Sequence, residues 1–152
     1  MQAWRIAKKI HALDRQGTGA RLAGGRWNSP GIATVYAGLT PEITAMEKLV
    51  HTGDILPKDL MLVLISLPDD DKLYRRHAVH DLPAGWDALP SSTAAVALGD
   101  EFQLAVTHLG MIVPSAVMPE AFNIVLNPAH PAFSGVTIEI LRPFEFDSRL
   151  RI

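Results

Sequence analysis

The spacing of hydrophobic and polar residues along the chain predicts strands and helices that are interspersed. Short apolar or β-branched runs bounded by glycine or polar residues favour strands. Strands are therefore expected over residues 3–7, 34–38, 60–67, 111–118 and 136–140. The stretch from 14 to 31 is rich in glycine and arginine, shows no such pattern, and is interpreted as a loop.

Two helices are expected between these strands. The first begins at Thr40, a favourable N-cap, with Pro41 at the first helical position. Apolar residues then recur every three or four positions, and Gly53 provides a stop. The second helix is expected over residues 92–109, where apolar residues again line one stripe.

Length and element order together predict the fold class. A chain of 152 residues is long enough to bury a core without a disulfide or a metal. Because strands outnumber helices and the two types alternate, we expect a single α+β domain over residues 1–152, with central mixed or antiparallel sheets and flanking helices. The absence of cysteine excludes disulfides, thiolate metal ligands and cysteine nucleophiles.

Composition also indicates where the protein works. A chain without cysteine fits a reducing cytoplasm. The longest apolar run, residues 60–67, is far shorter than the roughly 20 residues that cross a membrane. The first residues lack the pattern of a signal peptide. We therefore expect a cytoplasmic protein that does not associate with membranes.

Charge and histidine content argue against two classes of function. The net charge is −2 and the pI is about 6.3, whereas DNA-binding domains usually carry a basic patch and a high pI. Direct nucleic-acid binding is therefore not expected. Two pairs, His77 with His80 and Glu47 with His51, have the spacing of metal ligands on a helix, but no third ligand falls into place. We expect no metal site.

Glu47 is the first residue that suggests chemistry. At about 100° per residue it lies about 40° from Ile43 and about 60° from Val50 around the predicted helix, at the edge of the apolar stripe. A carboxylate placed there faces the protein or a cleft, and its burial is costly unless it is paired or used. The alternative is a rim glutamate that pairs with Lys48 or His51.

A glycine-rich segment, residues 24–31, contains a second group of candidates. Gly24 and Gly25 let the backbone approach a ligand and leave N–H groups for phosphate oxygens. Arg26 comes next, and its planar guanidinium matches a phosphate bidentately. The segment also contains turn-forming residues, so a structural loop with a solvated Arg26 is the alternative.

Ser115 interrupts an apolar segment after a proline. It is either an inert small residue or a hydroxyl aimed into a pocket. Because it does not lie in a G-x-S-x-G motif, we do not expect a hydrolase nucleophile. Asn123 and Asn127 follow in an otherwise apolar segment, and both need hydrogen-bond partners if they are buried.

Taken together, these segments resemble the RES domain family, named for arginine, glutamate and serine. The similarity extends from about residue 3 to about residue 147 and rests on the order and spacing of short motifs, each weak by itself. They include Gly25-Arg26-Trp27-Asn28-Ser29-Pro30-Gly31, Val35-Tyr36-Ala37, Ala45-Met46-Glu47-Lys48-Leu49, Leu82-Pro83-Ala84-Gly85-Trp86, Leu98-Gly99-Asp100 and Val113-Pro114-Ser115-Ala116-Val117. The resemblance implies a fold similar to that of ADP-ribosyltransferase toxins.

The resemblance also implies an activity. RES proteins are toxins of bacterial toxin–antitoxin systems, and members deplete NAD⁺ by hydrolysis or phosphorolysis. The family's four characteristic side chains fall on Arg26, Tyr36, Glu47 and Ser115, which are the expected catalytic residues. The expected substrate-binding residues are Gly25, Arg26, Trp27, Asn28, Tyr36, Ser115 and Asn123. NAD⁺ is a substrate in this interpretation, inorganic phosphate is a potential co-substrate, and no cofactor is implied.

The sequence also leads to an expected partner and leaves two alternative functions open. The resemblance implies an Xre-like helix-turn-helix antitoxin that covers the active site, and it makes a homodimer plausible. The first alternative function is an ADP-ribosyltransferase that uses the same pocket but passes ADP-ribose to a macromolecule. The second alternative is a binding module without catalysis that sequesters a nucleotide or a partner protein.

Overall fold

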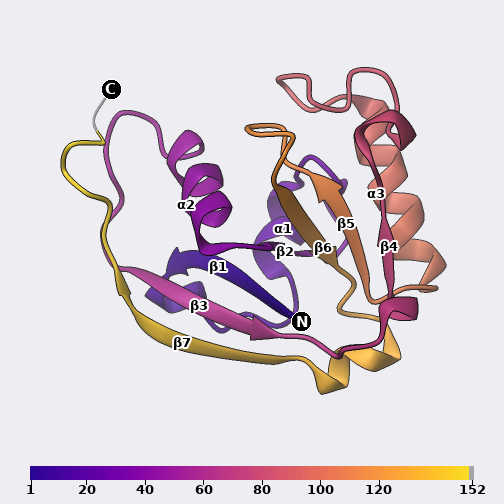
Figure 1. The fold of residues 1–152 in the computed structure, drawn as a ribbon, viewed down its shortest axis with the longest axis horizontal. Helices are drawn as coiled ribbons and strands as arrows, with labels where there is room; N and C mark the ends of the chain where they lie inside the picture. The colour runs from indigo at the N-terminus through magenta and orange to yellow at the C-terminus, as the bar shows by residue number, and fades with distance from the viewer. Residues whose placement is uncertain (151–152) are drawn as a thin grey trace.

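The molecule is built around one seven-stranded mixed sheet, and the helices lie against it (Figure 1). The computed structural model describes residues 1–150. The strands are β1 (Gln2–Lys8), β2 (Val35–Gly38), β3 (Leu60–Ser66), β4 (Tyr74–Arg76), β5 (Gly110–Pro114), β6 (Phe122–Leu126) and β7 (Thr137–Phe144). They lie in the order β4-β5-β6-β2-β1-β3-β7, and every neighbouring pair is antiparallel except β4 with β5.

Helices connect the strands and cover part of the sheet. The α-helices of residues 1–150 are α1 (Thr18–Ala23), α2 (Pro41–Val50) and α3 (Thr93–Ala105). Short 3₁₀ segments lie at Lys9–His11, Asp71–Leu73, Val79–Asp81 and Pro131–Gly135. In Figure 1, α2 and α3 stand apart, with β5 and β6 between them in this view. Within residues 1–150, no helix is both long enough and apolar enough to span a membrane.

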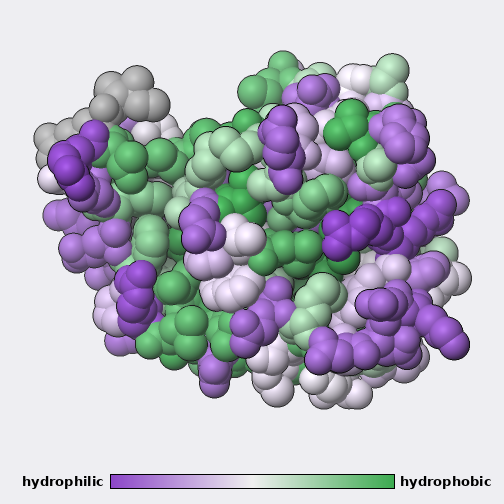
Figure 2. Space-filling model, in the orientation of Figure 1, coloured by the Kyte–Doolittle hydropathy of each residue, from purple (hydrophilic) through white to green (hydrophobic). Residues whose placement is uncertain are grey.

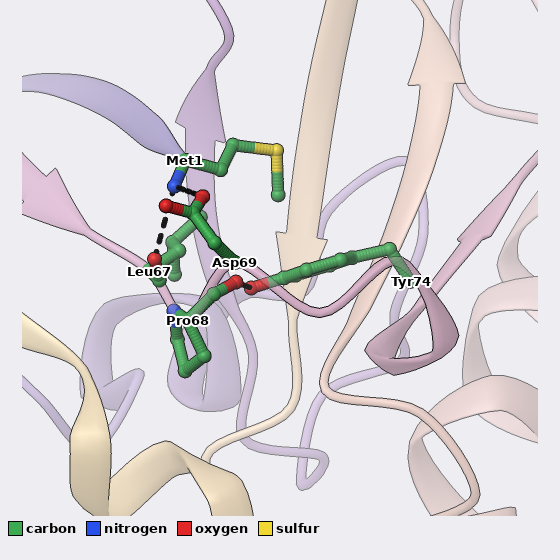
Figure 3. Close-up of polar contacts among 5 residues, drawn as sticks. All are labelled: Met1, Leu67, Pro68, Asp69 and Tyr74. Carbon is green, nitrogen blue, oxygen red and sulfur yellow. Dashed lines mark hydrogen bonds and ion pairs between the residues drawn. The ribbon is translucent and has the colours of Figure 1, made fainter.

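The pairing of β1 with β3 extends by one residue beyond the N-terminal end of β1. The main chain of Met1 exchanges two hydrogen bonds with Leu67, at 2.8 and 3.1 Å. The Met1 ammonium also pairs with Asp69, and the Tyr74 hydroxyl donates to the Pro68 carbonyl at 2.6 Å (Figure 3). These contacts fix the segment between β3 and β4 against Met1.

The two faces of the sheet carry separate parts of the hydrophobic core. The first cluster contains buried residues from five strands, among them Val35, Ala37, Val63, Ile65, Ile112, Ile124 and Leu126. Successive residues of a strand point to opposite faces, so the alternate positions form a second cluster with α3. This second cluster contains Met111, Val113, Val125, Ala95, Phe102, Trp27 and Trp86. We call the face with Met111, Val113 and Val125 the helix face.

Helix α2 also packs on the helix face, and Gly38 allows its close approach. Gly38 pairs with Asn123 in the sheet, and a Cβ at Gly38 would lie 2.2 Å from the Thr44 hydroxyl oxygen. That hydroxyl donates to the carbonyl of Thr40 at 2.9 Å, and it also lies 3.2 Å from the carbonyl oxygen of Trp4 on β1. Because Gly38 has no side chain, α2 can bring Glu47 over the strands β2 and β6.

The α+β class predicted from the sequence is confirmed. The strands expected over residues 3–7, 34–38 and 60–67 are present, with small differences at their ends. Helix α2 has Thr40 as its N-cap, whose hydroxyl accepts the N–H of Ile43 at 3.3 Å. It ends at Val50 rather than near Gly53.

Other parts of the element prediction are wrong. Residues 14–31 are not entirely loop, because they contain α1, whose six residues are too few to show a helical period. Helix α3 ends at Ala105 rather than 109, because Val106 adopts a left-handed conformation with φ of 52°. The strand expected over residues 111–118 stops at Pro114. The strands β4 and β6 were not predicted, and β7 extends beyond residue 140.

Candidate active site

Polar side chains from several elements meet over the helix face of the sheet. Tyr36 on β2 pairs with Val125, and Asn123 on β6 pairs with Gly38, so both side chains project from this face. Glu47 comes from α2, and Ser115 follows directly after β5. The site therefore lies at the junction of α2 with β5 and β6.

Glu47 accepts two hydrogen bonds on one oxygen of its carboxylate. Its Oε1 accepts the amide N–H of Asn123 at 2.6 Å and the hydroxyl of Ser115 at 2.7 Å. Among residues 1–150, no side chain or backbone group donates to the other oxygen, Oε2. The side chain is only half-buried. The pair of donors thus fixes the carboxylate and leaves Oε2 available to a ligand.

The alternative pairing of Glu47 is not observed. His51 does contact Glu47, but its Nδ1 lies 2.6 Å from the backbone carbonyl oxygen and not from the carboxylate. The carboxylate forms no ion pair with Lys48 among the described residues. Glu47 is therefore directed toward the sheet, as its position at the edge of the apolar stripe predicted.

Ser115 is fully buried, and its hydroxyl is saturated by the protein. Besides donating to Glu47, Oγ accepts the backbone N–H groups of Val117 at 3.0 Å and Met118 at 3.2 Å. A hydroxyl has one donor and two acceptor sites. All three are used, so Ser115 orients the Glu47 carboxylate and has no site left for a ligand in this arrangement.

The Tyr36 hydroxyl is similarly committed. It donates to Asn28 Oδ1 at 2.7 Å and accepts the backbone N–H of Trp27 at 3.0 Å. The direction is certain because Asn28 is 1% exposed and its Nδ2 faces three backbone carbonyls, at 2.8, 3.1 and 3.0 Å. Burial raises the pKa of Tyr36, and the Trp27 N–H offsets this only in part. The phenol therefore stays protonated.

Arg26 is half-buried and is held by a second loop. Its Nη1 donates to the carbonyls of Trp86 at 2.8 Å and Ala88 at 2.9 Å. The neighbouring Trp27 stacks on Trp86, with ring centroids 6.4 Å apart and planes at 18°. A guanidinium has five N–H donors, so Nε and Nη2 remain free to bind an anion. Arg26 is thus anchored rather than simply solvated.

The backbone N–H groups of Gly24 and Gly25 were expected to be free for a ligand, but both are bonded within the protein. The N–H of Gly24 donates to the carbonyl of Ala20 at 2.8 Å, and that of Gly25 donates to the carbonyl of Asn28 at 3.0 Å. These two N–H groups are therefore not free for phosphate oxygens. Their hydrogen bonds close the turn that presents Arg26.

The structure adds residues that the sequence did not single out. The carbonyls of Trp86 and Ala88 could not be foreseen, because every residue has a carbonyl and only the fold brings these two to Arg26. Asp100 on α3 accepts two hydrogen bonds from Ser29. Its only signal in the sequence was its place in one of the motifs that resemble the RES family.

Two side chains are held for binding, the Glu47 carboxylate by Ser115 and Asn123 and the Arg26 guanidinium by the carbonyls of Trp86 and Ala88. Within residues 1–150, no group of three or more His, Cys, Asp or Glu side chains is placed to bind a metal ion. A half-buried carboxylate with a free oxygen can stabilise positive charge that develops on a ligand. A guanidinium with free N–H groups can bind phosphate.

The structure defines a small α+β domain, and comparisons with known proteins agree with this class of fold. The model of the RES domain matches residues 2–147. A protein named Prs ADP-ribosylating toxin, from Sphingobium sp. (strain YBL2), is 35% identical over 97% of this chain and 94% of its own length. A protein named Toxin Res, from Pseudomonas putida, is 36% identical over 99% of each chain. The chain belongs to the RES domain family, as its motifs indicated.

A solved structure shares the fold. The chain matches a chain in the crystal structure of the M. tuberculosis MbcT-MbcA toxin-antitoxin complex with a TM-score of 0.69 and 18% sequence identity. The match covers 93% of this chain and 84% of that chain. At this identity the comparison concerns the architecture and not the chemistry.

Proposed function

We propose that this protein is the toxin of a toxin–antitoxin pair and that it depletes NAD⁺ by cleaving the bond between nicotinamide and ribose. The observation that carries the proposal is the Glu47 carboxylate, with Oε1 fixed by two donors and Oε2 free. Family membership supports it, because relatives with 31 to 36% identity are named as toxins.

The chemistry requires one carboxylate and no acid. In NAD⁺ the nicotinamide carries a positive charge, so it leaves as a neutral molecule when the electron pair of the C–N bond moves to its nitrogen. Ordinary glycosidases need a second carboxyl group to protonate the leaving oxygen, and this substrate does not. Positive charge develops on the ribose as the bond breaks, and Oε2 of Glu47 would stabilise it.

The other residues take roles that follow from their contacts. Asn123 and Ser115 orient the Glu47 carboxylate, since both donate to Oε1. The free N–H groups of Arg26 would bind the pyrophosphate of NAD⁺. The hydroxyl of Tyr36 is bonded to the protein, so its ring is the part that would pack against nicotinamide or its ribose.

The acceptor of ADP-ribose distinguishes two functions. Water would give free ADP-ribose, and inorganic phosphate would give a phosphorylated ADP-ribose. Transfer to a protein is the second candidate, because the relative from Sphingobium is named as an ADP-ribosylating toxin. In each case the bond from ribose to nicotinamide breaks and its electron pair leaves with the neutral nicotinamide. Water or a protein side chain releases a proton to solvent as its bond to ribose forms, whereas phosphate attacks through an oxygen that carries no proton.

Product analysis tests the proposal. The purified chain, freed of any partner, is incubated with NAD⁺ with and without inorganic phosphate, and the products are identified by mass. Release of nicotinamide is the expected result, and the second product identifies the acceptor. Mass added to a protein target, without free ADP-ribose, would favour the transferase. Folded protein that leaves NAD⁺ unchanged in every condition would contradict the proposal.

The partner would be an antitoxin with an Xre-like helix-turn-helix domain that covers the site. Two exposed apolar side chains flank it: Leu89, which is 86% exposed, follows the Ala88 carbonyl that binds Arg26, and Met118, which is 42% exposed, follows Ser115 by three residues. Figure 2 shows hydrophobic surface between α2 and β6. Leu89→Asp with Met118→Asp should weaken capture of the co-expressed antitoxin, and unchanged capture would contradict this placement. Homodimer formation stays a prediction, which light scattering would test.

A further inference from the structure

The segment that carries Arg26 is bonded to helix α3 by a side chain to which no role has been given. We call residues 24–29 the arginine loop. Both carboxylate oxygens of Asp100 accept hydrogen bonds from Ser29 in this loop, Oδ1 from the backbone N–H at 2.8 Å and Oδ2 from the hydroxyl at 2.5 Å. Hydrogen bonds to a charged acceptor are stronger than those between neutral groups. Asp100 is therefore a firm link between α3 and the loop.

The backbone of α3 also touches the arginine loop next to this link. A Cβ at Gly99 would lie 1.8 Å from the carbonyl oxygen of Trp27. No other residue type would fit at this position without moving either the helix or the loop. The helix and the loop are thus in direct contact, and Asp100 fixes which part of the loop lies against α3.

The opposite side of the loop is braced by Tyr36. Its hydroxyl bonds to Asn28 and to the backbone of Trp27, so the loop is held between β2 and α3. Asp100 acts to raise the pKa of Tyr36 and Arg26 acts to lower it, although burial has the largest effect. A shift of the loop away from α3 would carry Arg26 with it.

We propose that Asp100 is a positioning residue, which fastens the arginine loop to α3 and thereby sets the place of the Arg26 guanidinium. The inference rests on the proposed function in one respect, namely that Arg26 binds the pyrophosphate of NAD⁺. Asp100 itself uses both oxygens on Ser29 and is assigned no contact with substrate.

Asp100→Asn is the variant that tests this link, with Glu101→Gln as the matched control. Asparagine preserves the size of the side chain but loses the charge and one acceptor oxygen. Glu101 is the next residue of α3, it is exposed, and it lines a separate cavity together with Arg75 and His77. The control therefore removes the same charge from the same helix without touching the arginine loop.

The kinetic expectation separates positioning of Arg26 from the chemistry at Glu47. Asp100→Asn should raise the KM for NAD⁺ and the Kd for ADP-ribose on the order of 10-fold, because a misplaced binding group loses much of its effect. The kcat should stay within about threefold, since the contacts of Glu47 are unchanged. In an Arg26→Ala background, Asp100→Asn should change the ADP-ribose affinity by less than about twofold. An equal loss of affinity with and without Arg26 would overturn the proposal.

Hydrogen exchange gives a readout that does not depend on the substrate. The backbone N–H of Ser29 and the rest of the arginine loop should exchange on the order of 10-fold faster in Asp100→Asn and unchanged in Glu101→Gln. Unchanged exchange in Asp100→Asn would refute the positioning role. Wild-type protein that neither consumes NAD⁺ nor binds ADP-ribose would instead reject the proposed function, and the exchange result would then decide the role of Asp100.

Discussion

Replacement of Glu47 by glutamine tests the charge of the site with little disturbance to its shape. The amide oxygen of glutamine can take the place of Oε1 and still accept from Ser115 and Asn123, whose donors lie at 2.7 and 2.6 Å. The NH₂ group then takes the place of Oε2, which has no partner among residues 1–150. The side chain keeps its position and loses only its negative charge.

The size of the effect follows from the role proposed for the carboxylate. Loss of one preorganised group that stabilises charge in a transition state costs about 2.7–4 kcal/mol. At about 1.36 kcal/mol for each factor of ten, kcat should fall on the order of 10²- to 10³-fold. The free energy of unfolding should change by less than about 1 kcal/mol, because the hydrogen bonds are retained.

Initial rates of nicotinamide release at saturating NAD⁺ measure this effect. Glu42→Gln is the matched control, since Glu42 is exposed in the first turn of the same helix and makes no contact with the site. Its rate should stay within about twofold of the wild type, as expected for an exposed charge. Full activity of folded Glu47→Gln would refute the role of the charge. Equal losses in both variants would assign the effect to α2 and not to the carboxylate.

The remaining predictions concern Tyr36, Gly38 and His77. Tyr36→Phe leaves the two buried partners of its hydroxyl unsatisfied, so urea unfolding should show that the free energy of unfolding falls by about 1–3 kcal/mol. An unchanged free energy would contradict the role of this hydroxyl in holding the arginine loop. Gly38→Ala places a Cβ 2.2 Å from the Thr44 hydroxyl oxygen, so the free energy of unfolding should fall by about 1–3 kcal/mol and NAD⁺ turnover should also fall. Turnover equal to that of the wild type would show that α2 need not lie so close to the sheet. Burial, and then the charge of Arg75, lower the pKa of His77 from its ordinary value of 6.5. As the pH falls from about 7.5 to about 5.5, the unfolded state therefore binds more protons than the native state, and the free energy of unfolding should decrease. Urea titrations at several pH values measure this dependence, and His77→Gln should make it smaller.

Parts of the fold could be predicted where a local pattern decided the structure. Helix α2 has an N-cap, a proline at its first position and an apolar stripe, and each signal agrees with the others. Where a local signal was lacking, the prediction failed. Val106 adopts a left-handed conformation that valine rarely takes, so nothing in the sequence marked the end of α3 at Ala105. The three residues of β4 exist because β5 offers a parallel neighbour.

In the candidate site, too, the features set by a local pattern could be predicted, and those set by the tertiary fold could not. The helical position of Glu47 indicated that its carboxylate faces the protein, and this depends only on the spacing of apolar residues in one helix. Its partners, Ser115 and Asn123, lie 68 and 76 residues away in the sequence, so their hydrogen bonds depend on the strand order. The saturation of the Ser115 hydroxyl depends on backbone groups, which have no signature in a sequence.

The place of β6 in the sheet has a consequence for how the protein is made. Tyr36 and Glu47 are synthesised early, but Ser115 and Asn123 come later, and β6 lies between β5 and β2 in the sheet. A nascent chain therefore has a continuous sheet and an oriented carboxylate only after residues 122–126 have left the ribosome. At about 5–20 residues per second, the interval after Glu47 lasts roughly several seconds. The NAD⁺ cleavage that we propose would thus be absent during most of translation.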